Sequence, residues 1–199
     1  MPSDLVAVDI AILPPTPVSR LAIELSTALP REESPQGLLL GGDDYLPHIT
    51  LLQQFVSVDA MDTFLDRIGD VVRARRPMAL RGTGGGMGSN AVWISIERTP
   101  ALVDLHQQML DAALPFDRER GDALAFVGGD ARDRDVQWVT GYRISSSGPL
   151  FQPHITLGHA VRPPMIEPFD FEATTIAACH LGRFCSCRRI LRKWNLLRP

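Results

Sequence analysis

Long apolar runs and an excess of basic residues are both missing from the sequence. No stretch of the 199-residue chain approaches the roughly 18 consecutive apolar residues that mark a membrane-spanning helix. The apolar N-terminal segment is interrupted by Asp4 and Asp9 and follows no basic region, so we do not expect a signal peptide. The net charge is -3, whereas proteins that coat long nucleic acids carry positive charge to neutralise many phosphates. We therefore expect neither a membrane partner nor extended nucleic-acid binding.

Cysteine is scarce as well. The three cysteines, Cys179, Cys185 and Cys187, are an odd number and all lie near the C-terminus. This pattern argues against a disulfide framework and indicates a reducing compartment, for which the cytoplasm is the default expectation. Together with His180 these residues match no standard zinc spacing. The sequence therefore predicts no metal and no other cofactor.

The composition is that of an ordinary folded protein, with 45% hydrophobic and 22% charged residues, and the length fits one domain over residues 1–199. Apolar patterning predicts strands and helices in mixed order, which indicates an α+β or α/β protein. We expect strands at residues 5–13, 46–56, 78–81, 91–96, 151–161, 169–178 and 184–191, and helices at 18–29, 61–72 and 100–112. A glycine-rich turn is expected at 82–88, and the segment 114–148 shows the least regular pattern.

One pentapeptide occurs twice. Pro-His-Ile-Thr-Leu at residues 47–51 recurs at residues 153–157, and the two histidines, His48 and His154, stand 154 − 48 = 106 positions apart. A single His-x-Thr tripeptide would carry little information. Five shared residues, each time inside an expected strand, indicate two structurally equivalent units.

Strand geometry predicts which side chains of each motif act together. Residues i and i+2 of a strand point to the same side, so His48 lies beside Thr50 and His154 beside Thr156. The same alternation predicts that Gly158 continues this side and lets a ligand approach the backbone, and that His159 lies on the opposite side. If a pseudo-twofold axis relates the two units, both pairs meet across one cleft.

Two facing imidazoles suit the hydrolysis of a phosphodiester. One neutral ring can take a proton from the attacking water while a protonated ring donates to the leaving oxygen, and histidine reaches both forms near neutral pH. The hydroxyl groups of Thr50 and Thr156 can donate hydrogen bonds to phosphate oxygens, where charge builds in the transition state. Positioning and electrostatics dominate phosphoryl chemistry, so no metal is required.

Other residues carry weaker signals. Trp138 and Tyr142 are candidates for stacking on a base, with core or loop packing as the alternative, and Arg143 is a candidate for contacting a phosphate. The glycine-rich stretch 82–88 lacks the Gly-Lys-Ser/Thr ending of a phosphate loop and precedes a strand, which favours a simple turn. His106 lies beside the apolar stripe of its helix and is expected to be structural.

The two motifs resemble those of the 2H phosphoesterase superfamily, in particular its bacterial branch of 2′,5′-RNA ligase and RNA 2′,3′-cyclic phosphodiesterase. That superfamily has two His-x-Thr/Ser motifs, which here are His48/Thr50 and His154/Thr156. The stretches 80–93, 99–110 and 194–196 also resemble the family. The resemblance implies a duplicated, bilobal α+β fold in which two antiparallel sheets line a central cleft and the helices lie outside.

The resemblance also implies an activity, the hydrolysis of a 2′,3′-cyclic phosphodiester on an RNA end or nucleotide to a 2′-phosphate. His48 and His154 would be catalytic, Thr50 and Thr156 would bind the phosphate, and the protein would act as a monomer. Two alternatives stay open, a 2′,5′-phosphodiesterase or RNA ligase and a module that binds a nucleotide without turnover. A histidine-triad hydrolase is excluded because the sequence contains no His-x-His-x-His run.

Overall fold

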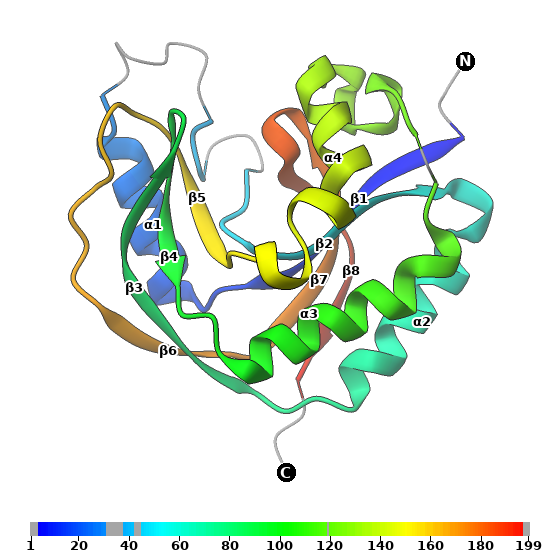
Figure 1. Cartoon of the computed structure of the whole chain (residues 1–199), viewed down its shortest axis with the longest axis horizontal. Coiled ribbons are helices and arrows are strands. Elements are labelled where there is room, and N and C mark those ends of the chain that lie inside the picture. The colour runs from blue at the N-terminus through cyan, green and yellow to red at the C-terminus, as the bar shows by residue number, and fades with distance from the viewer. Residues whose placement is uncertain (1–3, 31–37, 42–44, 119, 197–199) are drawn as a thin grey trace.

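A computed structural model of the protein describes residues 4–30, 38–41, 45–118 and 120–196 and shows two four-stranded antiparallel sheets (Figure 1). Sheet A has the strand order β2-β1-β7-β8, and sheet B the order β5-β4-β3-β6. The strands are β1 (Leu5–Leu13), β2 (Ile49–Ser57), β3 (Met78–Gly88), β4 (Ala91–Ile96), β5 (His154–His159), β6 (Phe169–Ala173), β7 (Thr175–Gly182) and β8 (Ser186–Asn195). The α-helices are α1 (Thr16–Ala28), α2 (Met61–Arg73), α3 (Pro100–Ala113) and α4 (Asp133–Ser145). The predicted α+β fold with two antiparallel sheets is confirmed.

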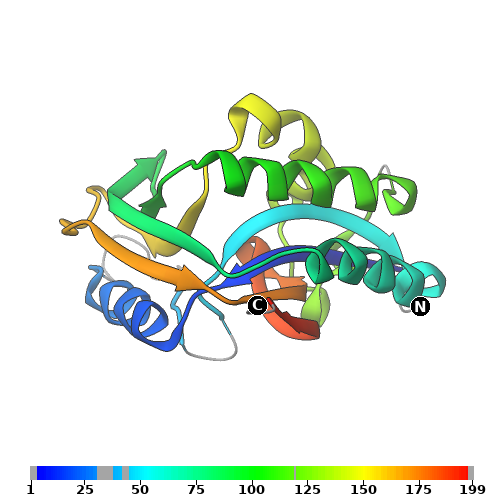
Figure 2. The same ribbon diagram turned by 90° about the horizontal axis from the view of Figure 1, so that it is seen from below.

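The duplication inferred from the motifs is visible in the order of the elements. In each half a strand and a helix precede the motif strand. β1 and α1 precede β2, and β4 and α3 precede β5, with α4 inserted between α3 and β5. The helices exchange places, because α1 packs on β5 of the other unit and α3 packs on β2. Figure 2 shows α2 and α3 beside the long strands of sheet A, while α1 lies at the other end beside sheet B. Each motif strand is therefore covered by a helix from the other unit.

Both motif strands carry a β-bulge at the same place. In β2 the pairing with β1 skips Leu51, and in β5 the pairing with β4 skips Leu157. A bulge places two successive residues on one side of the strand. Leu51 and Leu52 consequently both belong to the main hydrophobic core. The two units thus share a backbone irregularity as well as a sequence.

The second bulge corrects two predictions made from simple alternation. Gly158 follows Leu157 to the inner side, where an added Cβ would stand 3.0 Å from the Leu38 carbonyl oxygen, so it approaches α1 and its loop rather than a ligand. Its φ of 149° is also one that glycine adopts readily. His159 then lies on the side of His154 and Thr156, and not on the opposite side as predicted.

A pair of buried hydrogen bonds ties each bulge to the crossing helix. Ser26 Oγ in α1 donates to the Leu157 carbonyl at 2.6 Å and accepts from the Leu40 amide at 3.0 Å. His106 in α3 does the same with its two ring nitrogens. Its Nδ1 donates to the Leu51 carbonyl at 2.6 Å and its Nε2 accepts from the Gly148 amide at 3.3 Å. The predicted structural role of His106 follows from these contacts.

The glycine-rich stretch is a strand rather than the predicted turn. β3 continues to Gly88 and pairs with β4, so the turn is confined to Ser89 and Asn90. The glycines give room to large neighbours. An added Cβ on Gly86 would stand 2.1 Å from the indole Nε1 of Trp93. Strand periodicity cannot be read from residues that have no side chains, which is why this segment was predicted as a turn.

Two further segments differ from the sequence prediction. The expected strand 169–178 is split at Thr174, since β6 belongs to sheet B and β7 to sheet A. The segment 114–148 contains short 3-10 turns and the helix α4, which buries only Asp135, Val139 and Tyr142. So small an apolar stripe gives little periodic signal. Within the described residues no helix is both long and apolar enough to span a membrane.

We expect the bulge contacts to be major contributors to stability. Ser26→Ala and His106→Ala should each lower the free energy of unfolding by about 1–3 kcal/mol, because each leaves buried backbone groups without partners. His106→Ala should be the more severe, since it also removes the ring stacked on Phe151 at 3.9 Å. Urea denaturation measures both, with the exposed Gln107→Ala as a control expected within about 0.5 kcal/mol of wild type. If both variants match the control, the contacts carry no net stability.

Candidate active site

The two motif histidines have the same local geometry. His48 Nδ1 lies 2.7 Å from the carbonyl oxygen of Leu46, and His154 Nδ1 lies 2.7 Å from that of Gln152. A carbonyl oxygen only accepts, so Nδ1 carries a proton in both rings. In the neutral ring Nε2 then holds the lone pair of a base, and in the charged ring Nε2 holds the proton of an acid.

The structure brings the two histidines into one site. β2 and β5 lie in contact, and His48 is close enough for its charge to act on His154. Burial lowers the pKa of His154 below its ordinary value, and the hydrogen bond to the Gln152 carbonyl opposes this shift while the charge of His48 adds to it. The neutral form of His154 is thereby favoured at neutral pH. His48 is itself buried, with 8% of its surface exposed.

The two motif threonines differ in their contacts. The Thr50 hydroxyl donates to Asp9 Oδ2 at 2.7 Å. Thr156 lies opposite Trp93 in the sheet, and among the described residues no hydrogen-bond partner is found for its hydroxyl. A hydroxyl has one proton to donate. Thr156 can therefore donate directly to a ligand, whereas Thr50 must first give up its bond to Asp9.

Asp9 is the main residue of the site that the sequence prediction missed. It lies in β1 and is completely buried, and its Oδ2 accepts from Thr50 and from Gln53 Nε2 at 2.8 Å. The same oxygen lies 3.7 Å from His48 Nε2. Asp9 Oδ1 is buried and has no hydrogen-bond partner among the described residues. Burial raises the pKa of this carboxyl, opposed by the charge of His48 and by its hydrogen bonds.

Three possible metal ligands lie close together within the described part of the chain. The ligand atoms of Asp9, His48 and Cys187 all stand within 4.8 Å of one another. Burial raises the pKa of the Cys187 thiol well above its usual range. Asp9 Oδ2 is already occupied by two hydrogen bonds. We interpret Asp9 and Cys187 as the buried polar surroundings of His48. The three cysteines are free thiols.

The second histidine has an aromatic neighbour instead of a carboxylate. The rings of Trp93 and His154 lie 5.0 Å apart at an angle of 41°. Trp93 Nε1 donates to Ser95 Oγ at 3.2 Å, which fixes the indole beside the histidine. Further along this side of β5, the ring of His159 lies 5.4 Å from that of Phe184. Burial and then the charge of Arg132 lower the pKa of His159, which favours its neutral form.

The aromatic residues predicted as substrate contacts differ in their burial. Tyr142 is buried with 4% of its surface exposed, and burial followed by the charge of Asp9 raises the pKa of its phenol. Trp138 lies one turn from Tyr142 on the same side of α4 and is 49% exposed. The other end of that side, at Asp135, accepts a hydrogen bond from the Phe184 amide. Trp138 therefore lies between Asp135 and Tyr142 on one side of α4.

Arg143 is engaged within the fold. Its guanidinium donates to Asp117 Oδ2 at 2.8 Å, to the Leu110 carbonyl at 3.1 Å and to Gln54 Oε1 at 2.8 Å. Gln54 lies on the opposite side of β2 from Gln53, so Arg143 joins α3, α4 and the edge of sheet A away from the histidines. Its geometry does not support the predicted phosphate contact.

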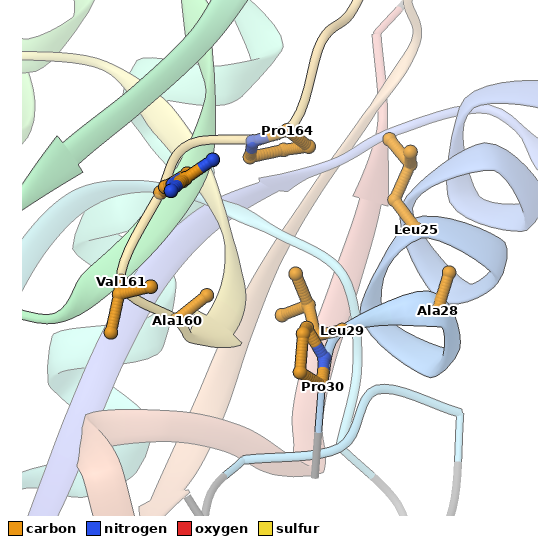
Figure 3. A pocket seen from close by; sticks show the side chains of 8 residues that line it. Leu25, Ala28, Leu29, Pro30, Ala160, Val161 and Pro164 are labelled. Atoms are coloured by element: carbon orange, nitrogen blue, oxygen red, sulfur yellow. The ribbon is translucent and has the colours of Figure 1, made fainter. Parts of the chain in front are cut away.

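A separate apolar hollow lies between the end of α1 and the chain after β5 (Figure 3). Its lining consists of Leu25, Ala28, Leu29, Pro30, Ala160, Val161, Arg162 and Pro164. None of these residues belongs to a motif, and Arg162 is the one charged side chain among the described residues that line the hollow. It is not the site of the histidine chemistry.

Comparisons with known structures agree with the fold. A structure described as a phosphoesterase is 20% identical, with a TM-score of 0.60 and 100% of both chains covered. LigT of E. coli in its apo form is 18% identical, with a TM-score of 0.59 and 98% of this chain and 99% of that chain covered. TT0787 of Thermus thermophilus is 18% identical, with a TM-score of 0.58 and 96% of this chain and 97% of that chain covered. At these identities the likeness shows the fold. No curated protein matches the sequence.

The family is shown by a different comparison. The model of the 2'-5' RNA ligase superfamily matches residues 42–178, a range that contains both histidine motifs. Family and fold together support an enzyme of the phosphoesterase type. Since the match covers well over half of the residues, the chain belongs to the 2'-5' RNA ligase superfamily and shares the fold of its LigT-like phosphoesterases.

Proposed function

We propose that the protein hydrolyses a 2′,3′-cyclic phosphodiester on an RNA end or a nucleotide, without a metal, and releases a 2′-phosphate. The observation that carries this proposal is the equivalence of the two motif histidines. Both rings donate through Nδ1 to the carbonyl two residues earlier, which leaves both Nε2 atoms for proton transfer in one shared site. Such a pair can serve as base and acid in a single displacement.

The reaction needs two proton transfers. One histidine takes a proton from water through Nε2 as the water oxygen bonds to phosphorus. The bond between phosphorus and the 3′ oxygen breaks, and the other histidine gives its Nε2 proton to that oxygen. The products are a 2′-phosphate and a free 3′ hydroxyl, and proton exchange with solvent restores the pair. The Thr156 hydroxyl, and that of Thr50 once released from Asp9, would donate to the non-bridging oxygens.

A nucleotide or RNA end is the substrate class that fits best. LigT of E. coli has been solved with phosphate, NADP+, 3'-AMP and ATP. In this chain the half-exposed indole of Trp138 on α4 offers a surface on which an unpaired base can stack. The charge of -3 fits a substrate held at one terminus rather than along its length.

Two other functions use the same residues. A 2′,5′-phosphodiesterase or RNA ligase would need the same acid and base, and the family name makes it the second candidate. A module that binds a nucleotide without turnover would not need two rings with equivalent Nδ1 contacts. Incubation with 2′,3′-cyclic nucleotides and with 2′,5′-linked dinucleotides separates the three, because binding without product would favour the module.

The central test is a pH series on wild type, His48→Ala, His154→Ala and the double variant. Wild type should show a bell-shaped rate profile, because one ring must be neutral while the other is protonated. Each single variant should lose about 10²–10⁴-fold in turnover, and the double variant should be little worse, since the two rings act as a unit. His106→Ala is the matched control for a structural histidine, provided that activity is measured per folded molecule.

The same series with EDTA tests the metal. Activity should be unchanged by the chelator, because no ion is needed to generate the nucleophile. Inhibition by EDTA that a divalent ion restores would refute the mechanism. Near-normal turnover in either single variant would remove that histidine from it.

The threonines should contribute unequally. Thr156→Val removes a hydroxyl that can donate directly to the phosphate and should lower turnover by about 10–10³-fold. Thr50→Val should cost less, because that hydroxyl is bonded to Asp9. Steady-state kinetics on both variants decide the order, with thermal melting to confirm folding. Full activity in both would show that neither threonine binds the phosphate.

The position of the phosphate in the product tests which oxygen leaves. A 2′,3′-cyclic nucleotide should yield the 2′-phosphate, as in the family branch that the sequence resembles. Chromatography against 2′- and 3′-monophosphate standards measures the ratio. A dominant 3′-phosphate would mean that the substrate binds in the opposite sense.

A further inference from the structure

The two units differ at two pairs of equivalent positions beside the histidines. Alignment on the bulges places Ala11, opposite Thr50, at the position of Trp93, opposite Thr156. Two residues earlier in each strand, Asp9 corresponds to Ala91. His48 therefore has a buried carboxylate that His154 lacks. The duplicated fold gives both rings the same Nδ1 contact, so the carboxylate beside His48 and the indole beside His154 are what make the two rings chemically unequal.

The surroundings hold the Asp9 carboxylate in one place. The hydroxyl of Thr50 and the amide of Gln53 both donate to Oδ2, the oxygen that lies 3.7 Å from His48 Nε2. A second bond from Gln53 Nε2 to the Cys185 carbonyl, at 3.4 Å, holds that amide in turn. A fixed, buried carboxylate interacts with a nearby charge far more strongly than one in water. Asp9 and His48 are thus positioned to hold one proton between them.

We propose that Asp9 is a positioning residue that keeps this proton on His48 Nε2, so that His48 donates to the leaving oxygen and His154 takes the proton from water. The proposal rests on the proposed function and assigns the two proton-transfer roles within it. An anionic phosphate in the site adds to the effect of Asp9, because both negative groups favour the charged imidazole.

The other groups that face this pair support the assignment. From β5 comes His154, whose lowered pKa leaves it neutral and ready to accept a proton. From β8 comes the Cys187 thiol, and from α4 the Tyr142 phenol, and burial raises the pKa of both so that neither carries charge near neutral pH. The pKa of the Cys185 thiol is also raised, chiefly by burial and to a smaller extent by the charges of Asp135 and Asp9. Asp9 is the anionic group nearest to His48 among the described residues.

The test is the pH profile of Asp9→Asn, which removes the charge and preserves the shape. The acid must be protonated, so His48 sets the alkaline limb of the bell, and loss of a carboxylate at this distance should move that limb down by about 1–2 pH units. At pH values above the alkaline limb of each protein, the turnover of Asp9→Asn should therefore be about 10–100-fold lower than that of wild type, with little change in KM. The acidic limb should move little. Asp170→Asn, at an exposed carboxylate, is the matched control and should overlay wild type.

A second readout asks directly whether His48 is the acid. In a 2′,3′-cyclic nucleotide with sulfur in place of the 3′ bridging oxygen, the leaving thiolate needs no proton. His48→Ala and Asp9→Asn should then recover to within about tenfold of wild type, since acid catalysis is no longer needed, while His154→Ala should remain inactive. Recovery of His154→Ala instead would reverse the assignment and overturn the proposal.

A measurement on the wild-type protein covers the case in which Asp9→Asn does not fold. In a histidine-labelled NMR titration, the ring of His48 should lose its proton at a higher pH than the ring of His154, and the opposite order would overturn the proposal. Failure of the proposed function would look different. If His48→Ala and His154→Ala both keep their activity, the two-histidine mechanism is wrong. If both are inactive but Asp9→Asn follows the wild-type profile, only the role of Asp9 is wrong.

Discussion

Two backbone carbonyls, those of Leu51 and Leu157, are the points on which the arrangement of the site depends. Each is the carbonyl of a bulged residue that the sheet leaves without its regular partner, and each would be costly to bury unbonded. The donors come from the crossing helices, Ser26 for one and His106 for the other. The two side chains are chemically unlike, yet each also accepts a hydrogen bond from a backbone amide in the chain that leads to a motif, Leu40 in one case and Gly148 in the other. One solution has thus been built twice with different residues.

The bulges decide which side chains meet in the site. Each bulge adds one residue directly after the threonine and so shifts the alternation of side chains by one position. Gln53 and His159 therefore lie on the side of the motif histidines, whereas strict alternation would place them on the opposite side. Gln53 then reaches Asp9, and His159 reaches Phe184. A strand without the bulge would have put Leu52 and Gly158 at these places. The polar network around His48 is therefore a consequence of backbone geometry as much as of sequence.

The parts of the structure that could be predicted carry a pattern in the sequence, and most of those that could not depend on the bulges. Apolar patterning located β1, β2, β4 and the first three α-helices, and the repeated pentapeptide identified His48, Thr50, His154 and Thr156 as the candidate site. A bulge at leucine leaves no mark in a sequence, so the sides of His159 and Gly158 were predicted wrongly. Helix α4 was missed because its apolar stripe is so small. Asp9 did carry a signal, since it is a lone charge within an apolar strand. Its contacts with Thr50 and Gln53 in β2, however, depend on the register of the two strands, which the sequence does not reveal.

The exchange of helices between the units sets a condition on how the chain reaches its native state. Ser26 meets the Leu157 carbonyl across 131 positions of sequence, and His106 meets the Leu51 carbonyl across 55. When only the first unit has been synthesised, its motif strand β2 is exposed, because the helix that covers it, α3, belongs to the second unit. Contacts between such distant positions slow folding, because the entropy of closing the loop must be lost before they form. The duplicated halves are therefore not two independent folding units, and the first of them must remain incomplete until most of the second has been synthesised.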